Sequence, residues 1–176
     1  MRIIILGQPR SGKSTLATIL SKELNISIIC TDKYRREWNY HEPWKGYDTE
    51  INPEKQQNFY KQLNELYNSY EDVILEGSSI NPKDRNLFNY DAIVLLGRNI
   101  TAEDMLKNSR IYDQDWTTRR NDEYLLELFN NYLSYSKVWV SKNKEIYIDT
   151  TNFEVGIENA KKYILEQLKD VNYKCI

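Results

Sequence analysis

Residues 7–15 read Gly7-Gln8-Pro9-Arg10-Ser11-Gly12-Lys13-Ser14-Thr15, and they directly follow the apolar run Ile3-Ile4-Ile5-Leu6. The stretch fits the pattern G-x-x-x-x-G-K-[ST] without a departure. Its two glycines let the backbone turn back on itself, so that successive N–H groups point into one concavity. An amphipathic pattern follows, with apolar side chains at Leu16, Ile19, Leu20 and Leu24. This position between an apolar strand and a helix predicts a phosphate-binding loop rather than an ordinary glycine-rich turn.

A triphosphate is expected to lie in this loop, at the positive end of the helix that follows. Lys13 would reach the β- and γ-phosphates, and the Ser14 hydroxyl would be a ligand of Mg²⁺. ATP and Mg²⁺ are therefore the expected cofactors. The residues expected to contact the nucleotide are Gly7, Pro9, Arg10, Ser11, Gly12, Lys13, Ser14 and Thr15.

The composition describes one ordinary domain covering residues 1–176. The formal net charge is −2, so no basic field favours a nucleic-acid partner, and the apolar runs are too short to span a membrane. The two cysteines, Cys30 and Cys175, have no metal-like spacing, which favours a reduced, cytoplasmic setting. The oligomeric state stays open.

Apolar runs alternate with helical patterns along the whole chain, which predicts an α/β fold of three layers. About five parallel strands are expected, with helices on both faces of the sheet. The expected strands are 2–6, 26–31, 72–75, 92–96 and 145–148, and the expected helices are 13–24, 54–70, 102–111, 121–142 and 154–169. Two stretches, about 33–52 and 112–120, look irregular and should lie at the carboxyl edge of the sheet, where open α/β folds bind ligands.

Other classes of nucleotide-binding protein lack support in the rest of the chain. A GTPase should carry Asn-Lys-x-Asp after a late strand, but the candidate at residues 141–144, Ser-Lys-Asn-Lys, has no aspartate. A motor or helicase should have an apolar strand ending in Asp and further domains. Here the strand Val73-Ile74-Leu75 ends in Glu76-Gly77.

The layout resembles the small P-loop kinases, the adenylate kinase-like group that phosphorylates nucleoside monophosphates, nucleosides or shikimate-type metabolites. Residues 31–35, Thr-Asp-Lys-Tyr-Arg, are similar to the Asp-x-x-Arg of this family. The resemblance implies that Arg35 grips an anionic group of the acceptor and that Asp32 arranges the acceptor or Mg²⁺, beside Ser14. Glu76 and Gly77 are similar to the acid and glycine that lie beneath the acceptor.

Two later segments carry the same resemblance. Residues 119–122, Arg-Arg-Asn-Asp, are similar to the R-x-D-D element after the lid of nucleoside monophosphate kinases. This implies a lid at about 110–120, whose arginines, Arg119 and Arg120, surround the transferring phosphoryl group. Asp149 and Thr150 would belong to the loop that lies over the adenine.

The acceptor half departs from the family pattern. The lid has no cysteine set, which excludes a zinc-bearing lid. Where nucleotide kinases place Gly-Phe-Pro-Arg, this chain has Gly77-Ser78-Ser79-Ile80, with Arg85 several residues later. The acceptor-binding region at about 33–70 contains Trp38 and Trp44, which could either stack a base or pack the segment onto the domain.

Each candidate also has an ordinary structural explanation. Asp32 could serve as a general base or merely cap the following helix. Arg35 and Arg36 could clamp the acceptor or be helix-surface charges. Glu76 could bind the acceptor or cap nearby backbone, and the lid arginines could form a solvated turn.

The sequence therefore favours a kinase that moves the γ-phosphoryl group of ATP to a small acceptor, a nucleotide or nucleoside before another hydroxyl-bearing metabolite. A kinase of nucleic-acid 5′ ends is a further alternative. From a different class, the chain could be a regulatory nucleotide-binding module whose slow hydrolysis is sensed by a partner protein.

Overall fold

The computed structural model describes residues 1–38, 53–112, 121–138 and 144–172. Their order along the chain alternates strands and helices, as the sequence predicts. The elements are β1 (Arg2–Gly7), α1 (Lys13–Leu24), β2 (Ser27–Cys30), α2 (Thr31–Glu37), α3 (Pro53–Asn68), β3 (Val73–Glu76), the 3₁₀ helix η1 (Pro82–Leu87), β4 (Ala92–Gly97), α4 (Ala102–Tyr112), α6 (Asp122–Val138), β5 (Glu145–Asp149) and α7 (Phe153–Asn172).

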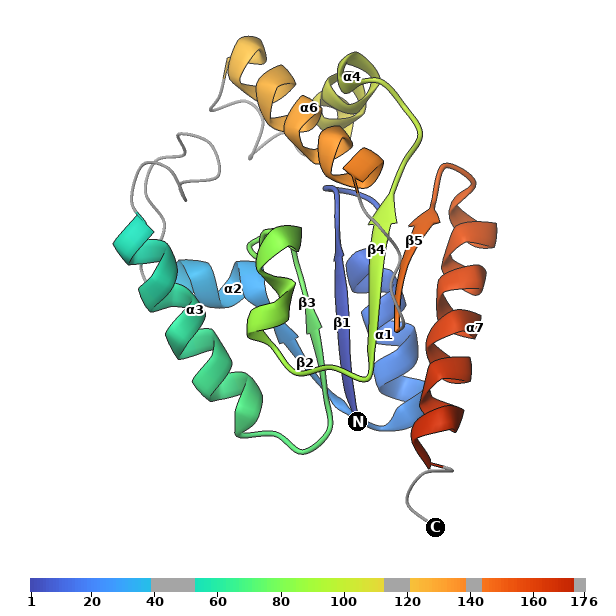
Figure 1. Ribbon diagram of the computed structural model, residues 1–176. Coiled ribbons are helices and arrows are strands. Elements are labelled where there is room, and N and C mark those ends of the chain that lie inside the picture. Colours follow the sequence, from blue (N-terminus) through green and yellow to red (C-terminus); the bar gives the residue numbers. More distant parts are fainter. Residues whose placement is uncertain (39–52, 113–120, 139–143, 173–176) are drawn as a thin grey trace.

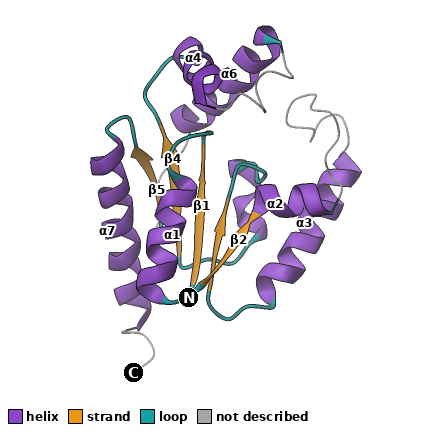
Figure 2. Cartoon of the chain, turned by 180° about the vertical axis from the view of Figure 1, so that it is seen from behind, coloured by secondary structure: helices purple, strands orange, loops and turns teal. Residues whose placement is uncertain are grey.

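The five strands form one parallel sheet with the order β2-β3-β1-β4-β5. Helices α1 and α7 cover one face of the sheet, and α3 and η1 lie over the other (Figures 1 and 2). Helices α4 and α6 lie together above the carboxyl ends of the strands, at the top of Figure 1. The three-layer fold and its five parallel strands are therefore confirmed.

Strand β1 shows why both faces must be covered. Ile3 and Ile5 pack into a core with α1 and α7, whereas Ile4 and Leu6 pack into a second core with α3. All four side chains are fully buried. An unbroken apolar run is thus expected here, because successive side chains alternate between two buried faces.

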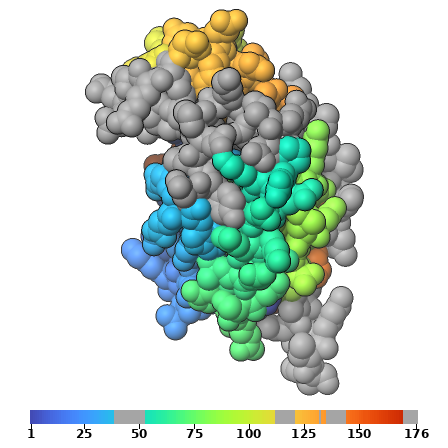
Figure 3. Space-filling view, turned by 90° about the vertical axis from the view of Figure 1, so that its left-hand side faces the viewer, coloured from blue at the N-terminus to red at the C-terminus, as the bar shows by residue number. Residues whose placement is uncertain are grey.

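The region after β2 differs from the sequence-based expectation. The predicted strand 26–31 ends at Cys30, and Thr31 begins α2, a helix that was expected to be an irregular segment. Trp38 packs on Phe59 of α3, with the ring centroids 6.1 Å apart, so this tryptophan joins the core beneath α3. Figure 3 shows α2 and α3 beside each other on this side of the molecule. The second tryptophan of the segment, Trp44, lies outside the described residues.

Local signals set several helix ends. Pro53 begins α3, where a missing N–H carries no penalty. Thr101 caps α4, because its Oγ1 accepts a hydrogen bond from the Asp104 N–H at 3.1 Å and donates to the Asp104 carboxylate at 3.0 Å. None of the helices that the structure describes is long and apolar enough to cross a membrane.

Candidate active site at the carboxyl edge of the sheet

The phosphate loop joins β1 to α1, and its conformation depends on glycine. Gly7 has φ +143°, and a Cβ there would lie 1.9 Å from the Leu96 carbonyl oxygen of β4. No other residue fits this approach without moving the backbone. The loop is closed by the Gln8 carbonyl, which accepts hydrogen bonds from the Ser11 hydroxyl (2.8 Å) and the Lys13 ammonium (2.7 Å).

Lys13 is buried at the first position of α1. Burial lowers its pKa, and this effect is opposed by the nearby acidic groups, Asp32 first, then Glu76 and then Cys30. The ammonium group therefore lies within electrostatic range of the Asp32 and Glu76 carboxylates. A cation held in this way can bind a phosphate group that comes between them.

The side chain of Ser14, in the first turn of α1, contacts the side chain of Glu76 at the end of β3. The Ser14 hydroxyl donates to Glu76 Oε2 at 3.2 Å, and Glu76 is itself buried as the last residue of β3. Cys30 lies beside the same carboxylate, and burial together with Glu76 raises the pKa of the Cys30 thiol to about 11. A hydroxyl and a carboxylate oxygen at this separation are the donor types that Mg²⁺ prefers.

This contact adds Glu76 beside Ser14 to the metal-site hypothesis drawn from the sequence, which pairs Ser14 with Asp32 and stays a prediction. Strand β3 lies between β1 and β2, so its terminal residue, Glu76, is the carboxylate next to the phosphate loop. Asp32 follows the more distant β2.

Asp32 instead bonds to the loop after β3. Its carboxylate accepts from the Ser79 hydroxyl at 2.6 Å and from the Ser78 N–H at 3.1 and 3.2 Å. The N-cap residue of α2 is Cys30, and no side chain caps that end, so the helix-cap interpretation of Asp32 is wrong. Gly77, with φ +143°, allows the close approach, since a Cβ there would lie 2.0 Å from Thr31 Oγ1.

The two arginines of α2 differ in their surroundings. Arg35 donates to Gln56 Oε1 of α3 at 3.3 Å. Its guanidinium carbon also lies over the Phe59 ring, 5.5 Å from the ring centroid, which is a cation–π contact. Arg36 is exposed. The structure thus places Arg35, but not Arg36, between the two helices that border the carboxyl edge.

Asp149 is the last residue of β5, on the other side of the phosphate loop, and Thr150 follows it. Thr150 is buried, and its N–H and hydroxyl both donate to the Gly97 carbonyl, at 2.7 and 3.0 Å. Asp149 accepts from the hydroxyl and the N–H of Thr151, and these hydrogen bonds hold the pKa of its carboxyl below the usual range.

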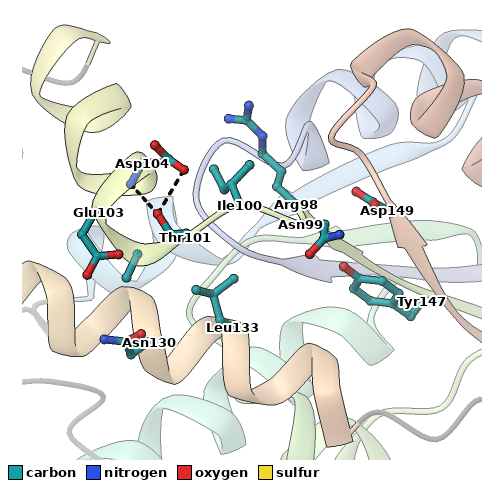
Figure 4. Close-up of a pocket in the computed structure, with 11 residues that line it drawn as sticks. Arg98, Asn99, Ile100, Thr101, Glu103, Asp104, Asn130, Leu133, Tyr147 and Asp149 are labelled. Atoms are coloured by element: carbon teal, nitrogen blue, oxygen red, sulfur yellow. Dashed lines mark hydrogen bonds between the residues drawn. The ribbon is translucent and has the colours of Figure 1, made fainter.

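A cavity of about 710 Å³ opens beside Asp149 (Figure 4). Arg98, Tyr147 and the first turn of α4 contribute to its wall, and α6 contributes Asn130 and Leu133. It lies at the carboxyl ends of β4 and β5, on the opposite side of β1 from Asp32 and Glu76.

The other predicted site residues lie in the phosphate loop and in the expected lid. Pro9 is half-buried, and Arg10 and Thr15 are exposed, while Ser11 is buried in the loop. Arg119 and Arg120 lie outside the described residues, as does most of the expected lid at about 110–120. Arg110, at the near end of that region, pairs with Asp122 of α6.

Sequence reasoning missed three residues near the site. Ser78 and Ser79 hold Asp32, and Gln8 links the phosphate loop to β4, because its Oε1 accepts from the Arg98 N–H at 3.0 Å. Serine residues directly after a glycine at a strand end were the available signal for the first two. No sequence signal distinguishes Gln8 from a solvent-facing loop residue.

Arg85 has no place at this edge. It donates to Glu145 at the amino end of β5, with N–O distances of 2.9 and 3.0 Å, and Tyr90 donates to the same carboxylate. The arginine that follows β3 in this sequence is therefore part of a structural ion pair.

Solved structures of kinases share the fold. Shikimate kinase from Bacteroides thetaiotaomicron is 17% identical, with a TM-score of 0.62 over 96% of this chain and 98% of that chain. Deoxyadenosine kinase from M. mycoides is 18% identical, with a TM-score of 0.60 over 97% and 100%. A gluconokinase from Sinorhizobium meliloti 1021 is 13% identical, with a TM-score of 0.62 over 98% and 96%.

One of the two sequence comparisons identifies a family. No curated protein sequence matches the chain. A family profile described as "AAA domain" matches residues 3–124, which include the phosphate loop and most of the sheet. The resemblance to P-loop small-molecule kinases is confirmed in the fold, and by its sequence the chain belongs to the AAA domain family.

Proposed function

We propose that this protein is an ATP-dependent phosphotransferase that moves the γ-phosphoryl group of ATP to a small acceptor. The observation that carries the proposal is the meeting of Lys13, Ser14, Glu76 and Asp32 around the phosphate loop. The kinase names of the structural neighbours support the same class of reaction.

Each residue has a proposed role in positioning the reactants. The loop N–H groups and Lys13 bind the phosphates, with Lys13 exchanging the Gln8 carbonyl for phosphate oxygens. Ser14 and Glu76 would hold Mg²⁺, which supplies positive charge beside the transferring phosphoryl group when it is bound. Asp149 and Thr150 would shape the loop beside the donor base.

The acceptor half would be formed by α2, α3 and the loop after β3. Asp32 and Arg35 are the proposed acceptor-binding residues there, with Glu76 and Gly77 beneath them. Arg36 stays a weaker candidate because its side chain is exposed. Arg119 and Arg120 keep their proposed role of neutralising the phosphoryl group, on the sequence alone.

The proposal is tested by following the γ-phosphoryl group itself. The protein is incubated with γ-labelled ATP, Mg²⁺ and a small-molecule extract, and the label should appear in an organic product. Lys13→Met should abolish this transfer, whereas Lys22→Met, on the exposed side of α1, should not. Label found only in inorganic phosphate, at a slow rate unaffected by the extract, would favour the regulatory nucleotide-binding module instead.

A further inference from the structure

The hydroxyl group of Tyr60, on α3, is buried and both donates and accepts hydrogen bonds. The side chain is 7% exposed and lies in the core between α3 and the sheet. Its hydroxyl donates to Asp84 Oδ2 of η1 at 3.0 Å and accepts from the Asn81 N–H at 3.0 Å. Burial raises the pKa of Tyr60, so the hydroxyl keeps its proton at neutral pH. Tyr60 therefore ties α3 to the segment that follows β3.

Gln56 lies one helical turn before Tyr60 and joins it to α2. Its side chain is buried, and its Oε1 accepts from Arg35 Nη1 at 3.3 Å. The Gln56 side chain also forms a hydrogen bond with the Tyr60 hydroxyl, which opposes the effect of burial on the Tyr60 pKa. Since the amide oxygen is directed to Arg35, the amide nitrogen is the group that donates to Tyr60. Gln56 therefore connects Arg35 of α2 with Tyr60 of α3.

The segment after β3 returns to α2 through Asp32. The Asp32 carboxylate accepts from the Ser79 hydroxyl at 2.6 Å and from the Ser78 N–H at 3.1 Å. Asp32 and Arg35 are three residues apart in α2, so they share one face of that helix. The contacts therefore close into a hydrogen-bonded ring, whose members are Asp32, Ser78, Ser79, Asn81, Tyr60, Gln56 and Arg35.

Helix α2 depends on its contacts with α3 and with the segment after β3 for its position. It has seven residues, and no side chain caps its first turn. A helix of this length is not stable by itself in water, so packing must hold it in place. Trp38, just after the helix, packs on Phe59 of α3 with the ring centroids 6.1 Å apart. The hydrogen-bonded ring holds the polar face of α2, on which Asp32 and Arg35 lie.

We infer that Gln56 and Tyr60 are positioning residues of the acceptor site. Through the hydrogen-bonded ring they fix the distance and angle between Asp32 and Arg35, which an acceptor held by both side chains must match. The inference rests on the proposed phosphotransferase function. It extends the acceptor site to two buried residues of α3 that act through other side chains and do not touch the acceptor.

Tyr60→Phe tests the hydrogen-bonded ring without any substrate. The variant keeps the buried aromatic ring and removes only the hydroxyl. The Asn81 amide then loses its acceptor, and the Ser78 amide should lose protection too, because its partner Asp32 belongs to the same ring of contacts. Hydrogen exchange measured by NMR should become about 10-fold faster or more at both amides. Faster exchange at Asn81 with unchanged exchange at Ser78 would overturn the inference.

Tyr67→Phe is the matched control. Tyr67 lies seven residues further along α3, is fully buried, and donates from its hydroxyl to the Asn89 carbonyl at 2.6 Å. This variant also loses one buried hydrogen bond, but outside the hydrogen-bonded ring. Its unfolding midpoint should fall about as much as that of Tyr60→Phe, while the Ser78 amide exchanges as in the wild type. Equal acceleration at Ser78 in both variants would indicate a general loss of stability and overturn the positioning role.

Kinetics test whether the positioning acts on the acceptor. ADP production is measured with a panel of nucleosides, nucleoside monophosphates and small hydroxy acids, and the compound that raises it most serves as acceptor. Tyr60→Phe and Gln56→Met should each raise the KM for this acceptor about 10-fold and leave the KM for ATP unchanged. The double variant should differ little from either single variant, because both changes open the same ring. Additive effects, or an equal rise in the KM for ATP, would overturn the inference.

The two experiments also separate this inference from the function on which it rests. If no compound of the panel raises ADP production, the phosphotransferase proposal is the one that loses support. The exchange rate of the Ser78 amide needs neither ATP nor an acceptor, so it still decides whether Tyr60 holds Asp32 in place.

Discussion

The Ser14 hydroxyl and the Glu76 carboxylate lie 3.2 Å apart, although 62 residues separate them in the chain. Strand β3 pairs with β1 in a register that sets Glu76 opposite Ile5, just before the phosphate loop. Ser14 is the second residue of α1, the helix after that loop. The pairing of the two strands therefore creates the candidate magnesium site.

Glu76→Gln tests this site. The amide keeps the size and hydrogen-bonding capacity of the side chain but removes its negative charge, so Mg²⁺ should bind more weakly. The Mg²⁺ concentration that gives half-maximal ADP production should rise about 10- to 100-fold. Glu65→Gln, on the exposed side of α3, serves as the control. An unchanged Mg²⁺ dependence in Glu76→Gln would remove this residue from the metal site.

Gly77→Ala should disturb the support of Asp32. The new Cβ would lie 2.0 Å from Thr31 Oγ1, and the residue has φ +143°, so the backbone must shift. A strained conformation of this kind costs about 1–3 kcal/mol of stability. Thermal unfolding should show the loss, and kcat should fall with it because Ser78 moves.

A second variant separates two causes of the lost stability, the collision of the new Cβ with Thr31 Oγ1 and the strain of the backbone at residue 77. Thr31→Ala removes the colliding oxygen, which has no hydrogen-bond partner among the described residues. Combined with Gly77→Ala it should restore part of the lost stability. If the double variant is as unstable as Gly77→Ala alone, the backbone conformation is the dominant cause.

Arg85→Ala should destabilise the fold without acting on the chemistry. Its side chain is 13% exposed and that of Glu145 only 1%, so the variant leaves a buried carboxylate without its cation. Such a loss costs about 3–5 kcal/mol. The unfolding midpoint should fall by about 10 °C, while KM and kcat at a low, permissive temperature stay near their wild-type values.

Glu145→Gln alone and the double variant Arg85→Ala with Glu145→Gln complete the double-mutant cycle. The neutral amide still accepts from the Tyr90 hydroxyl, whose pKa is raised to about 12 by burial and by Glu145. Stability should recover in the double variant relative to Arg85→Ala. A loss of activity without a loss of stability in Arg85→Ala would contradict the structural role.

Because of Lys13, the free energy of unfolding should change with pH in the alkaline range. Burial lowers the pKa of Lys13 in the folded protein below the unfolded value of 10.5, so in the window between them the unfolded state binds more protons. The free energy of unfolding contributed by Lys13 therefore rises with pH through this window, by at most about 1.4 kcal/mol per pH unit.

The comparison with Lys13→Met isolates this effect, because the tyrosines titrate in both proteins. Denaturant unfolding without nucleotide should show wild type gaining stability relative to Lys13→Met as the pH rises toward 10.5. A constant or falling difference would mean that Asp32 and Glu76 outweigh the burial of the ammonium group.

Local sequence patterns were sufficient to predict most of the helices and strands, but not the short helix α2. Helix α1 begins at Lys13 and ends at Leu24 as predicted, because the loop glycines and the apolar spacing act within one segment. Helix α2 was missed because its seven residues follow a strand with no turn signal and include few apolar side chains. Its position depends on packing against α3, which lies beyond the reach of any local pattern.

In the candidate site, too, local sequence patterns predicted some features and only the structure showed the others. Asp32 and Glu76 could be picked out because each follows an apolar run in the sequence that predicts a strand, and parallel sheets gather their ligand-binding groups at the strand ends. Their partners could not be assigned, since each carboxylate bonds to a residue more than 40 positions away. Arg85 was equally ambiguous, because only the structure shows that it points to Glu145.

By itself, the sequence determined the phosphate loop and the parallel α/β class, because glycine spacing and apolar runs act through local backbone preferences. Only the tertiary structure decided which carboxylate faces Ser14 and which faces the loop after β3. The physical reason is the strand order: β3 lies between β1 and β2, so Glu76 at its end contacts Ser14, whereas Asp32 bonds to Ser78 and Ser79. Strand order is set by the packing of the whole chain.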